Sequence, residues 1–350
     1  MKSLSYIPAL LALLLLTLTT TLNAAADRLP FSPDQIPVKP KGENATRFIV
    51  LSDANSSYGE TTYRKDVRDL IRLTTQHIKP DLVISAGDLI AAQKRGFGQD
   101  ILNSMWQGFD NAVYLPLKRA AIPFAPTPGN HDASGYPAFK IDCDVFRARW
   151  QDPNNKPPLN FVGWLNDFPT YYAHSVNNIL FLSLNITTME PLDSQQWAFI
   201  EEALANANNF DHVFVTAHVP PYPIAHGRET QCMTPDDAAR ITKLFADNNV
   251  SVFFTGHHHA YYKARKKGLN LISLNACGNG PRKLIGTTEP QKQSLIVVDI
   301  VDKKITNVFA LKSNSTIFED KSLPDKLQYE NITLHRFDSQ DPDTEPEATK

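Results

Sequence analysis

The chain has 350 residues, of which 42% are apolar, 21% charged and 10% aromatic, and its formal net charge is −2. This is ordinary globular composition, and the length suits one large domain or two small ones. A charge balance so close to neutral argues against nucleic acid or an anionic membrane as a partner.

The N-terminus has the three parts of a secretory signal peptide. Lys2 supplies the positive region, "ALLALLLLTLTTTL" the apolar core, and Ala24–Ala26 a small-residue cleavage site. A membrane anchor is the alternative, but the uncharged stretch is shorter than a bilayer usually needs. We therefore predict that residues 1–26 are removed, that the protein is exported to the periplasm or the extracellular space, and that no stable membrane anchor remains.

Strands and helices alternate after residues 27–45, which are rich in Pro, Lys and Asp and predict an extended N-terminal segment. Apolar runs predict strands at 47–52, 81–87, 122–132, 212–220, 251–259, 269–276, 294–301 and 304–311. Helices are predicted at about 63–78, 100–119, 193–207 and 234–248, the last two opened by Asp193 and Thr234 as N-caps. Residues 170–185 predict a hairpin that turns at Asn177–Asn178. This alternation indicates one α/β domain over 46–312, followed by a polar tail over 313–350 whose end we expect to be disordered.

The chain has three cysteines, Cys143, Cys232 and Cys277. Export permits disulfides, and an odd count allows one bridge and a spare thiol. Cys143 and Cys232 both lie in loop-like surroundings, so we predict that they pair. Cys277 follows a strand-like run and is predicted to be a small buried residue.

Five of the predicted strands end in acidic, amide or histidine side chains. In α/β sheets, ligands bind beyond the carboxyl ends of the strands, so these side chains are expected to converge on one site. The candidates are Asp53, Asn55, Asp88, Asn130, His131, His218, His257 and His259. Such a mixed nitrogen and oxygen set suits Mn, Fe or Zn. Because residues i and i+2 of an extended segment face the same side, His257 and His259 point together and His258 points away.

The order and spacing of these residues resemble the calcineurin-like metallophosphoesterase superfamily. The matching blocks are "DAN" (53–55), "GD" (87–88), "GNHD" (129–132), "AH" (217–218) and "GHHH" (256–259). Taken singly, each block has an ordinary alternative, such as a turn aspartate, a core histidine or a chance histidine tract. Five blocks in the family order, each at a predicted strand end, favour the resemblance.

The resemblance implies an α/β fold, with a two-sheet β-sandwich flanked by helices, and a dinuclear centre of two divalent or trivalent metal ions. Asp88 would bridge the ions. Asp53 and His259, with Asn55 nearby, would hold the first ion, and Asn130, His218 and His257 the second. A metal-bound hydroxide would attack phosphorus, and His131 would donate a proton to the leaving oxygen.

Two positions depart from the family pattern. Asn55 stands where the family has histidine, and an amide oxygen is the weaker ligand. Asn55 also opens an Asn-x-Ser glycosylation signal, and a contact with substrate is a further alternative for it. Ala91 stands where relatives have Asp or Tyr, which predicts no purple chromophore and leaves Asp132 or another group to orient His131.

The expected substrate is a small phosphorylated molecule, bound by a chain that we expect to be monomeric. The loop after His218 contains His226 and Arg228, which are candidates for phosphate recognition; a solvated loop charge is the alternative for Arg228. Two other functions remain open: a non-catalytic relative that binds a phosphorylated ligand or a metal, and a protein-contact domain. An intact His131 argues against a pure binder, which needs no acid at that position.

Overall fold

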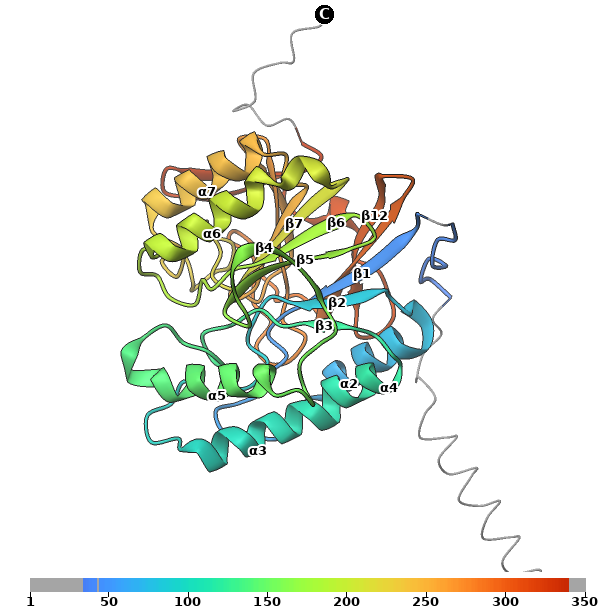
Figure 1. The fold of residues 1–350 in the computed structure, drawn as a ribbon. Coiled ribbons are helices and arrows are strands. Elements are labelled where there is room, and N and C mark those ends of the chain that lie inside the picture. Colours follow the sequence, from blue (N-terminus) through green and yellow to red (C-terminus); the bar gives the residue numbers. More distant parts are fainter. Residues whose placement is uncertain (1–33, 43, 340–350) are drawn as a thin grey trace, which may run out of the picture.

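The computed structural model describes residues 34–42 and 44–339 (Figure 1). The predicted signal peptide (1–26) and the end of the predicted tail (340–350) lie outside these residues. In the part of the chain that is described, no helix is long and apolar enough to cross a membrane.

The smaller of two β-sheets has five strands in the order β12-β11-β1-β2-β3. Strand β1 runs parallel to β2, and β2 parallel to β3, so the carboxyl ends of these three strands lie at one edge. Strand β11 pairs with β1 in the antiparallel direction and β12 continues the sheet. The bounds are β1 Thr46–Leu51, β2 Leu82–Ser85, β3 Phe124–Ala125, β11 Ser294–Val301 and β12 Lys304–Lys312.

The larger sheet has nine strands in the order β13-β14-β9-β10-β8-β7-β6-β5-β4. Its centre, from β6 through β7 and β8 to β10, is parallel, and antiparallel hairpins extend it on both sides. The bounds are β4 Asn160–Asp167, β5 Tyr171–Val176, β6 Ile179–Ser183, β7 His212–Ala217, β8 Val252–Thr255, β9 Tyr262–Lys266, β10 Leu269–Ser273, β13 Lys326–Tyr329 and β14 Ile332–Arg336.

Helices cover the outer faces of both sheets, which gives four layers (Figure 1). The bounds are α2 Lys65–Leu73, α3 Gln99–Phe109, α4 Leu115–Arg119, α5 Lys140–Gln151, α6 Ser194–Ala205 and α7 Pro235–Asp247. The first four pack on the five-stranded sheet, and α6 and α7 on the nine-stranded sheet. The predicted α/β fold with a two-sheet sandwich and flanking helices is confirmed.

Strand β1 shows how the sequence builds these layers. Phe48 and Val50 face the core between the sheets, whereas Ile49 and Leu51 face the helices. Successive side chains of a strand point to opposite faces, so a strand covered on both sides must be apolar throughout. Each such buried side chain contributes roughly 1.5–3 kcal/mol of hydrophobic stabilisation.

Several local predictions are confirmed. The Asp193 carboxylate accepts a hydrogen bond from the Gln196 N–H at 2.8 Å and caps α6. The Thr234 hydroxyl accepts from the Asp237 N–H at 3.2 Å and caps α7. Asn177 and Asn178 both have positive φ, +48° and +60°, as the two-residue turn between β5 and β6 requires.

Other elements were not predicted. The sequence patterns do not predict helix α5 or strands β4 and β9. Strands β13 and β14 form a hairpin beyond Lys312, where a polar tail is predicted, and β14 pairs with β9. Their sequence is polar because the hairpin lies at the edge of the sheet, and only Leu327 and Leu334 turn into the core.

The predicted Cys143–Cys232 disulfide is wrong: all three cysteines are free. The Cys143 thiol donates to the Ser134 carbonyl at 2.8 Å, and the Cys232 thiol lies 3.6 Å from the Glu229 carbonyl. Cys277 is buried, as predicted. Burial, together with nearby acidic groups, raises the pKa of the Cys143 thiol to about 11, so it is a poor nucleophile at neutral pH.

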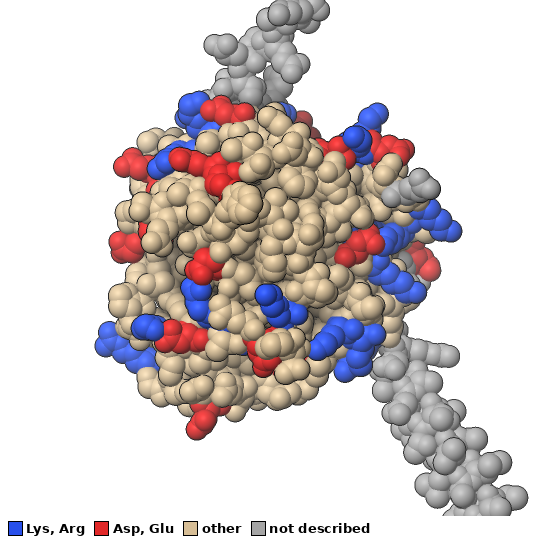
Figure 2. All heavy atoms as spheres, viewed as in Figure 1, with Lys and Arg blue, Asp and Glu red and all other residues tan. Residues whose placement is uncertain are grey.

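The face of the molecule in Figure 2 carries positive and negative side chains side by side, on a largely uncharged surface. The exposed ion pairs of the described residues include Arg147 with Asp167 and Arg240 with Glu201, each with a nitrogen and an oxygen 2.7 Å apart. Exposed pairs of this kind contribute little stability, about 0–1 kcal/mol each.

Candidate metal centre

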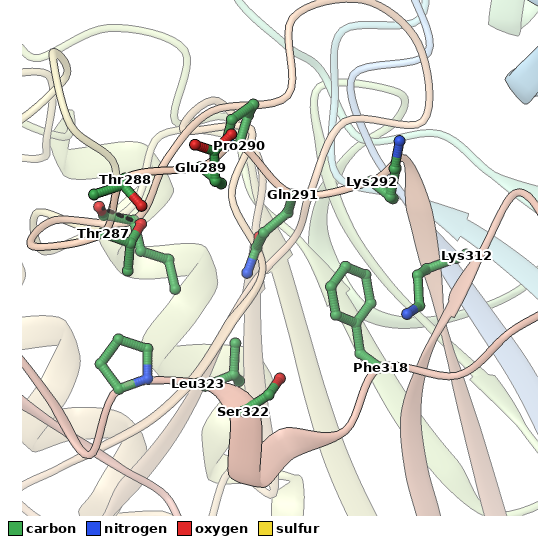
Figure 3. A pocket seen from close by; sticks show the side chains of 12 residues that line it. Thr287, Thr288, Glu289, Pro290, Gln291, Lys292, Lys312, Phe318, Ser322 and Leu323 are labelled. Carbon is green, nitrogen blue, oxygen red and sulfur yellow. Dashed lines mark hydrogen bonds between the residues drawn. The ribbon is translucent and has the colours of Figure 1, made fainter.

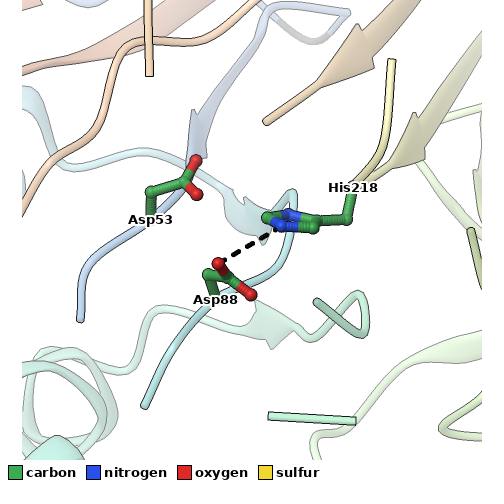
Figure 4. Close-up of side chains that lie close together, drawn as sticks. All are labelled: Asp53, Asp88 and His218. Carbon is green, nitrogen blue, oxygen red and sulfur yellow. Dashed lines mark ion pairs between the residues drawn. The ribbon is translucent and has the colours of Figure 1, made fainter. Parts of the chain in front are cut away.

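The carboxyl ends of strands from both sheets meet at one place. Asp53 follows β1, Asp88 follows β2, and His218 follows β7. One ligand atom from each of these three buried residues lies within 4.8 Å of the others (Figure 4). The five-stranded sheet therefore supplies the carboxylates and the nine-stranded sheet the imidazole, so the site exists only where the two sheets pack together.

Four of the predicted ligands occupy the left-handed region of backbone space. The φ angles are +51° for Asp53, +55° for Asp88, +62° for His257 and +53° for His259. Residues other than glycine rarely adopt this conformation, and such strain is concentrated at functional sites. Each of these residues lies in the loop that follows its strand, at a point where the chain turns sharply.

Two glycines allow the loops to approach closely. A Cβ atom on Gly87, whose φ is +90°, would lie 2.5 Å from Nδ1 of His218. A Cβ atom on Gly129 would lie 2.1 Å from the backbone nitrogen of Asp88. Any side chain at either position would separate the loops that bring the ligands together.

His218 is held in one orientation. Its Nδ1–H donates to the Ala86 carbonyl at 2.8 Å, which leaves Nε2 as the nitrogen that faces the site. This Nε2 lies 3.3 Å from Oδ2 of Asp88 and 2.9 Å from Oδ1 of Asn130. Burial opposes protonation, but the negative charges of Asp88 and Asp53 outweigh it and raise the pKa of His218 to about 9.

Asn130 connects two imidazoles. Its Oδ1 lies 2.9 Å from His218 Nε2 and 2.9 Å from His257 Nδ1. Its Nδ2 donates to Oε1 of Gln93 at 2.7 Å, which fixes the amide with its oxygen toward the histidines. Gln93 was missed in the sequence, where it stands in an ordinary loop with no signal of a role.

Asp53 and His259 form a second pair. The His259 Nδ1–H donates to the Gly280 carbonyl at 2.9 Å, and Nε2 lies 2.9 Å from Oδ1 of Asp53. The Ser52 hydroxyl donates to Oδ2 of Asp53 at 2.6 Å. Burial opposes ionisation of Asp53, but His259 outweighs it and the pKa of the carboxyl is lowered.

These contacts fit metal ions. With Nδ1–H committed to a backbone carbonyl, each Nε2 of His218 and His259 presents a lone pair toward an oxygen that is also an acceptor. Two facing acceptors 2.9 Å apart repel each other unless a proton or a cation lies between them. Buried carboxylate, amide and imidazole groups are the donors that Mn, Fe and Zn accept, and the second ring nitrogens are oriented as metal ligands usually are.

Asn55 is buried beside this group, and hydrogen bonds hold both its side chain and its backbone. Its Nδ2 donates to the Ile90 carbonyl at 3.4 Å, and its backbone N–H donates to the Asp88 carbonyl at 3.3 Å. The Ile90 contact is the one hydrogen bond of this side chain among the residues that the structure describes.

His131 lies at the open side of the site. Its backbone N–H donates to Oδ1 of Asp88 at 2.8 Å, and its Nε2 lies 3.9 Å from Oδ2 of the same carboxylate. The group next to its Nδ1 is the Ala92 carbonyl, at 3.4 Å. Asp132, one predicted orienter of His131, instead accepts the Leu89 and Gly129 N–H groups, both at 2.6 Å, and braces the loops.

The two candidates for phosphate recognition occupy different positions. Nη1 of Arg228 lies 3.1 Å from Nε2 of His257, at the site. His226 is exposed, and its Nδ1 lies 3.2 Å from Oε1 of Glu229. Of the two, Arg228 is the one that contacts a predicted ligand.

A separate cavity of about 350 Å³ lies beside β12 (Figure 3). It is lined by Thr287, Thr288, Glu289, Gln291, Lys312, Phe318 and neighbouring residues. None of the predicted metal ligands lines it, so the cavity and the candidate metal centre are distinct places.

Comparison with known proteins gives a family match over most of the described chain. The family model described as calcineurin-like phosphoesterase matches residues 46–261. Purple acid phosphatase 18 of Arabidopsis thaliana is 26% identical over 243 residues, which are 68% of this chain and 49% of the relative. The chain thus spans about half the length of that curated relative.

Solved structures show the same architecture. A purple acid phosphatase from yellow lupin (Lupinus luteus) seeds matches with a TM-score of 0.59 and 16% identity, over 81% of this chain and 54% of that one. A dimetal phosphatase from Danio rerio matches with a TM-score of 0.53 and 12% identity, over 76% of this chain and 95% of that one. At 16% and 12% identity, these matches show that the fold is shared and nothing further.

Proposed function

The chain belongs to the calcineurin-like phosphoesterases, and on that premise we propose that it is an exported, metal-dependent hydrolase of small phosphate esters. The observation that carries this proposal is the convergence of Asp53, Asp88 and His218, with ligand atoms within 4.8 Å of one another. The resemblance to secreted-type sequences at residues 1–26 supports export.

We assign the ligands to two ions, because their contacts fall into two groups. Asp53 and His259 are 2.9 Å apart and would hold one ion, with Asn55 close to it. Asn130 lies 2.9 Å from both His218 and His257, and these three would hold the other. Asp88, which has a ligand atom within 4.8 Å of those of Asp53 and His218, would contribute to both sites. When bound, the ions would lower the pKa of a water molecule and neutralise charge on the phosphoryl oxygens.

We assign His131 as the proton donor. With Nδ1–H held by the Ala92 carbonyl, a protonated His131 presents its Nε2–H to the open side, where it would protonate the leaving oxygen. Its backbone bond to Asp88 ties the ring to the position of the predicted bridging carboxylate. Arg228, adjacent to His257, would bind a phosphoryl oxygen.

The test is hydrolysis of p-nitrophenyl phosphate and its bis-ester by purified protein supplied with Mn, Zn, Fe or Mg, alongside metal analysis. We expect turnover with at least one metal and two metal equivalents per chain. No turnover with any metal would reject the hydrolase and favour the alternative, a phosphoesterase-like protein that binds a ligand or contacts another protein.

A further inference from the structure

Two arginines from different loops come together beside the candidate metal centre. Arg228 lies in the loop that follows β7, and Arg282 in the loop that follows β10. Backbone hydrogen bonds join these loops: the His226 N–H donates to the Lys283 carbonyl at 2.9 Å, and the Ile285 N–H to the Ile224 carbonyl at 3.0 Å. The pairing holds the two loops at a fixed separation.

Each arginine is also tied to one of the predicted histidine ligands. Nη1 of Arg228 lies 3.1 Å from Nε2 of His257. The Arg282 N–H donates to the His259 carbonyl at 2.8 Å. Nη1 of Arg282 lies 4.0 Å from the position that a Cβ atom on Gly227 would occupy, so its side chain reaches alongside the residue before Arg228.

The positive charge of this arginine pair is not balanced locally. Among the described residues, neither guanidinium has a carboxylate oxygen within the 4.0 Å of an ion pair. Nε of Arg282 is buried and has no hydrogen-bond partner. Burial and the nearby charge of Arg228 lower the pKa of Arg282. Two like charges and a buried unpaired donor destabilise the site unless an anion joins them.

We infer that Arg282 and Arg228 together form a subsite for the terminal oxygens of a phosphate monoester, and that this subsite makes the enzyme prefer monoesters to diesters. The inference rests on the proposed phosphoesterase function. A monoester carries close to two negative charges near pH 7 and has three terminal oxygens for forked guanidinium donors. A diester has one charge and two such oxygens, so it gains less from a second arginine.

Phosphate binding tests the subsite without any need for turnover. Inorganic phosphate is titrated calorimetrically into the metal-loaded wild-type protein and the Arg282→Gln variant. Loss of a charge-assisted contact is expected to weaken phosphate binding about tenfold. Lys283→Gln removes an exposed charge from the next position in the same loop and should change the affinity less than about twofold.

Turnover tests the preference for monoesters. Arg282→Gln should raise KM for p-nitrophenyl phosphate about tenfold and change KM for the bis-ester by less than about threefold. Arg282→Lys keeps the positive charge but loses the forked donors. Its KM for p-nitrophenyl phosphate should therefore lie between that of the wild type and that of Arg282→Gln. Equal losses for both esters, or unchanged phosphate affinity in a folded Arg282→Gln variant, would overturn the inference.

The two proposals fail in different ways. If the wild-type protein turns over neither ester, the proposed function fails, and the phosphate titration still decides whether the arginines bind an anion. If the wild-type protein turns over both esters and Arg282→Gln leaves their ratio unchanged, the hydrolase stands and the inference about Arg282 is wrong.

Discussion

At the scale of single residues, Asn55 is the position where this chain departs from its family, because asparagine stands where the family pattern has histidine. Its amide nitrogen donates to the Ile90 carbonyl at 3.4 Å, which leaves the amide oxygen as the atom that could bind a metal. The first ion would then have Asp53, Asp88, His259 and, in place of an imidazole, only this weaker oxygen donor.

Asn55→His should therefore tighten the first site. An imidazole is a better ligand than an amide for Mn, Fe or Zn. We therefore expect the variant to retain more metal per chain than the wild type after the same dialysis. Metal analysis of both proteins after the same dialysis is the measurement. If the variant loses activity with unchanged metal content, Asn55 contacts substrate and its assignment near the first ion is wrong.

His131→Asn should reduce kcat by roughly 10²–10⁴-fold, because it removes a general acid and leaves the metal ligands in place. The loss should be larger for phenyl phosphate than for p-nitrophenyl phosphate, since the poorer leaving group depends more on protonation. Comparison of kcat for the two esters, with metal content as the control, checks this. An equal loss for both esters would assign His131 a role other than proton donor.

Gln93 positions a ligand without being one. Gln93→Leu removes the acceptor for Asn130 Nδ2, so the amide can turn its nitrogen toward the histidines, and metal affinity should fall about 10-fold or more. Calorimetric titration with Mn measures the change. Gln107→Leu is the matched control, because Gln107 is exposed and its side chain donates to Asn111, away from the site. Unchanged affinity in Gln93→Leu would mean that Asn130 is oriented by other contacts or does not bind metal.

At the scale of elements, the β13–β14 hairpin supports the strands that carry the histidine motif. Strand β14 pairs with β9, which pairs with β10 and through it with β8, the strand that precedes His257 and His259. The segment before the hairpin also contributes Asp320, which accepts a hydrogen bond from the Tyr261 hydroxyl at 2.7 Å and pairs with Lys263.

Truncation after Lys312 should consequently destabilise the protein by several kcal/mol. It removes the buried Leu327 and Leu334, each worth roughly 2–5 kcal/mol in a core, and exposes the edge of β9. Urea unfolding followed by circular dichroism measures the loss. Truncation after Ser339 is the control, because it keeps the whole hairpin and measures the effect of removing residues 340–350 alone. An unchanged midpoint for the Lys312 truncation would support a domain that ends at 312.

At the scale of the whole molecule, the site couples metal binding to folding and to pH. His218 is protonated in the metal-free protein up to a pKa of about 9, and a proton on Nε2 excludes a metal from that nitrogen. Metal binding should release this proton. Metal affinity should accordingly rise as the pH increases toward 9.

The free energy of unfolding of the metal-free protein should instead fall as the pH rises. Because the folded state raises the pKa of His218, its pairing with Asp88 stabilises the fold fully below the ordinary histidine pKa of about 6.5 and is lost as the pH rises through about 9. The loss is on the order of 3 kcal/mol. The difference in Tm between metal-loaded and EDTA-treated protein should widen between pH 6.5 and 9. A constant difference would show that His218 does not exchange a proton for a metal.

Much of the architecture could be predicted because its signals are local. The apolar run of β1, the Asp193 and Thr234 caps and the Asn177–Asn178 turn each depend on a few neighbouring residues. The hairpin at β13 and β14 could not be predicted, because its polar residues become a strand only through pairing with β9. The disulfide prediction is wrong for a similar reason. Loop-like sequence around two cysteines does not determine whether the tertiary structure brings them within bonding distance.

The sequence by itself determined the identities and order of the candidate metal ligands, because their side-chain chemistry and their place after apolar strands are local properties. Only the tertiary structure decided which atoms meet. Asp53 and the His257 backbone come together across 204 positions of sequence, and Gln93 reaches Asn130 across 37. Such contacts depend on how the two sheets pack, which no short pattern encodes. The same packing placed the Asn55 amide nitrogen against the Ile90 carbonyl and brought Arg282, an ordinary loop residue in the sequence, beside the loop of Arg228.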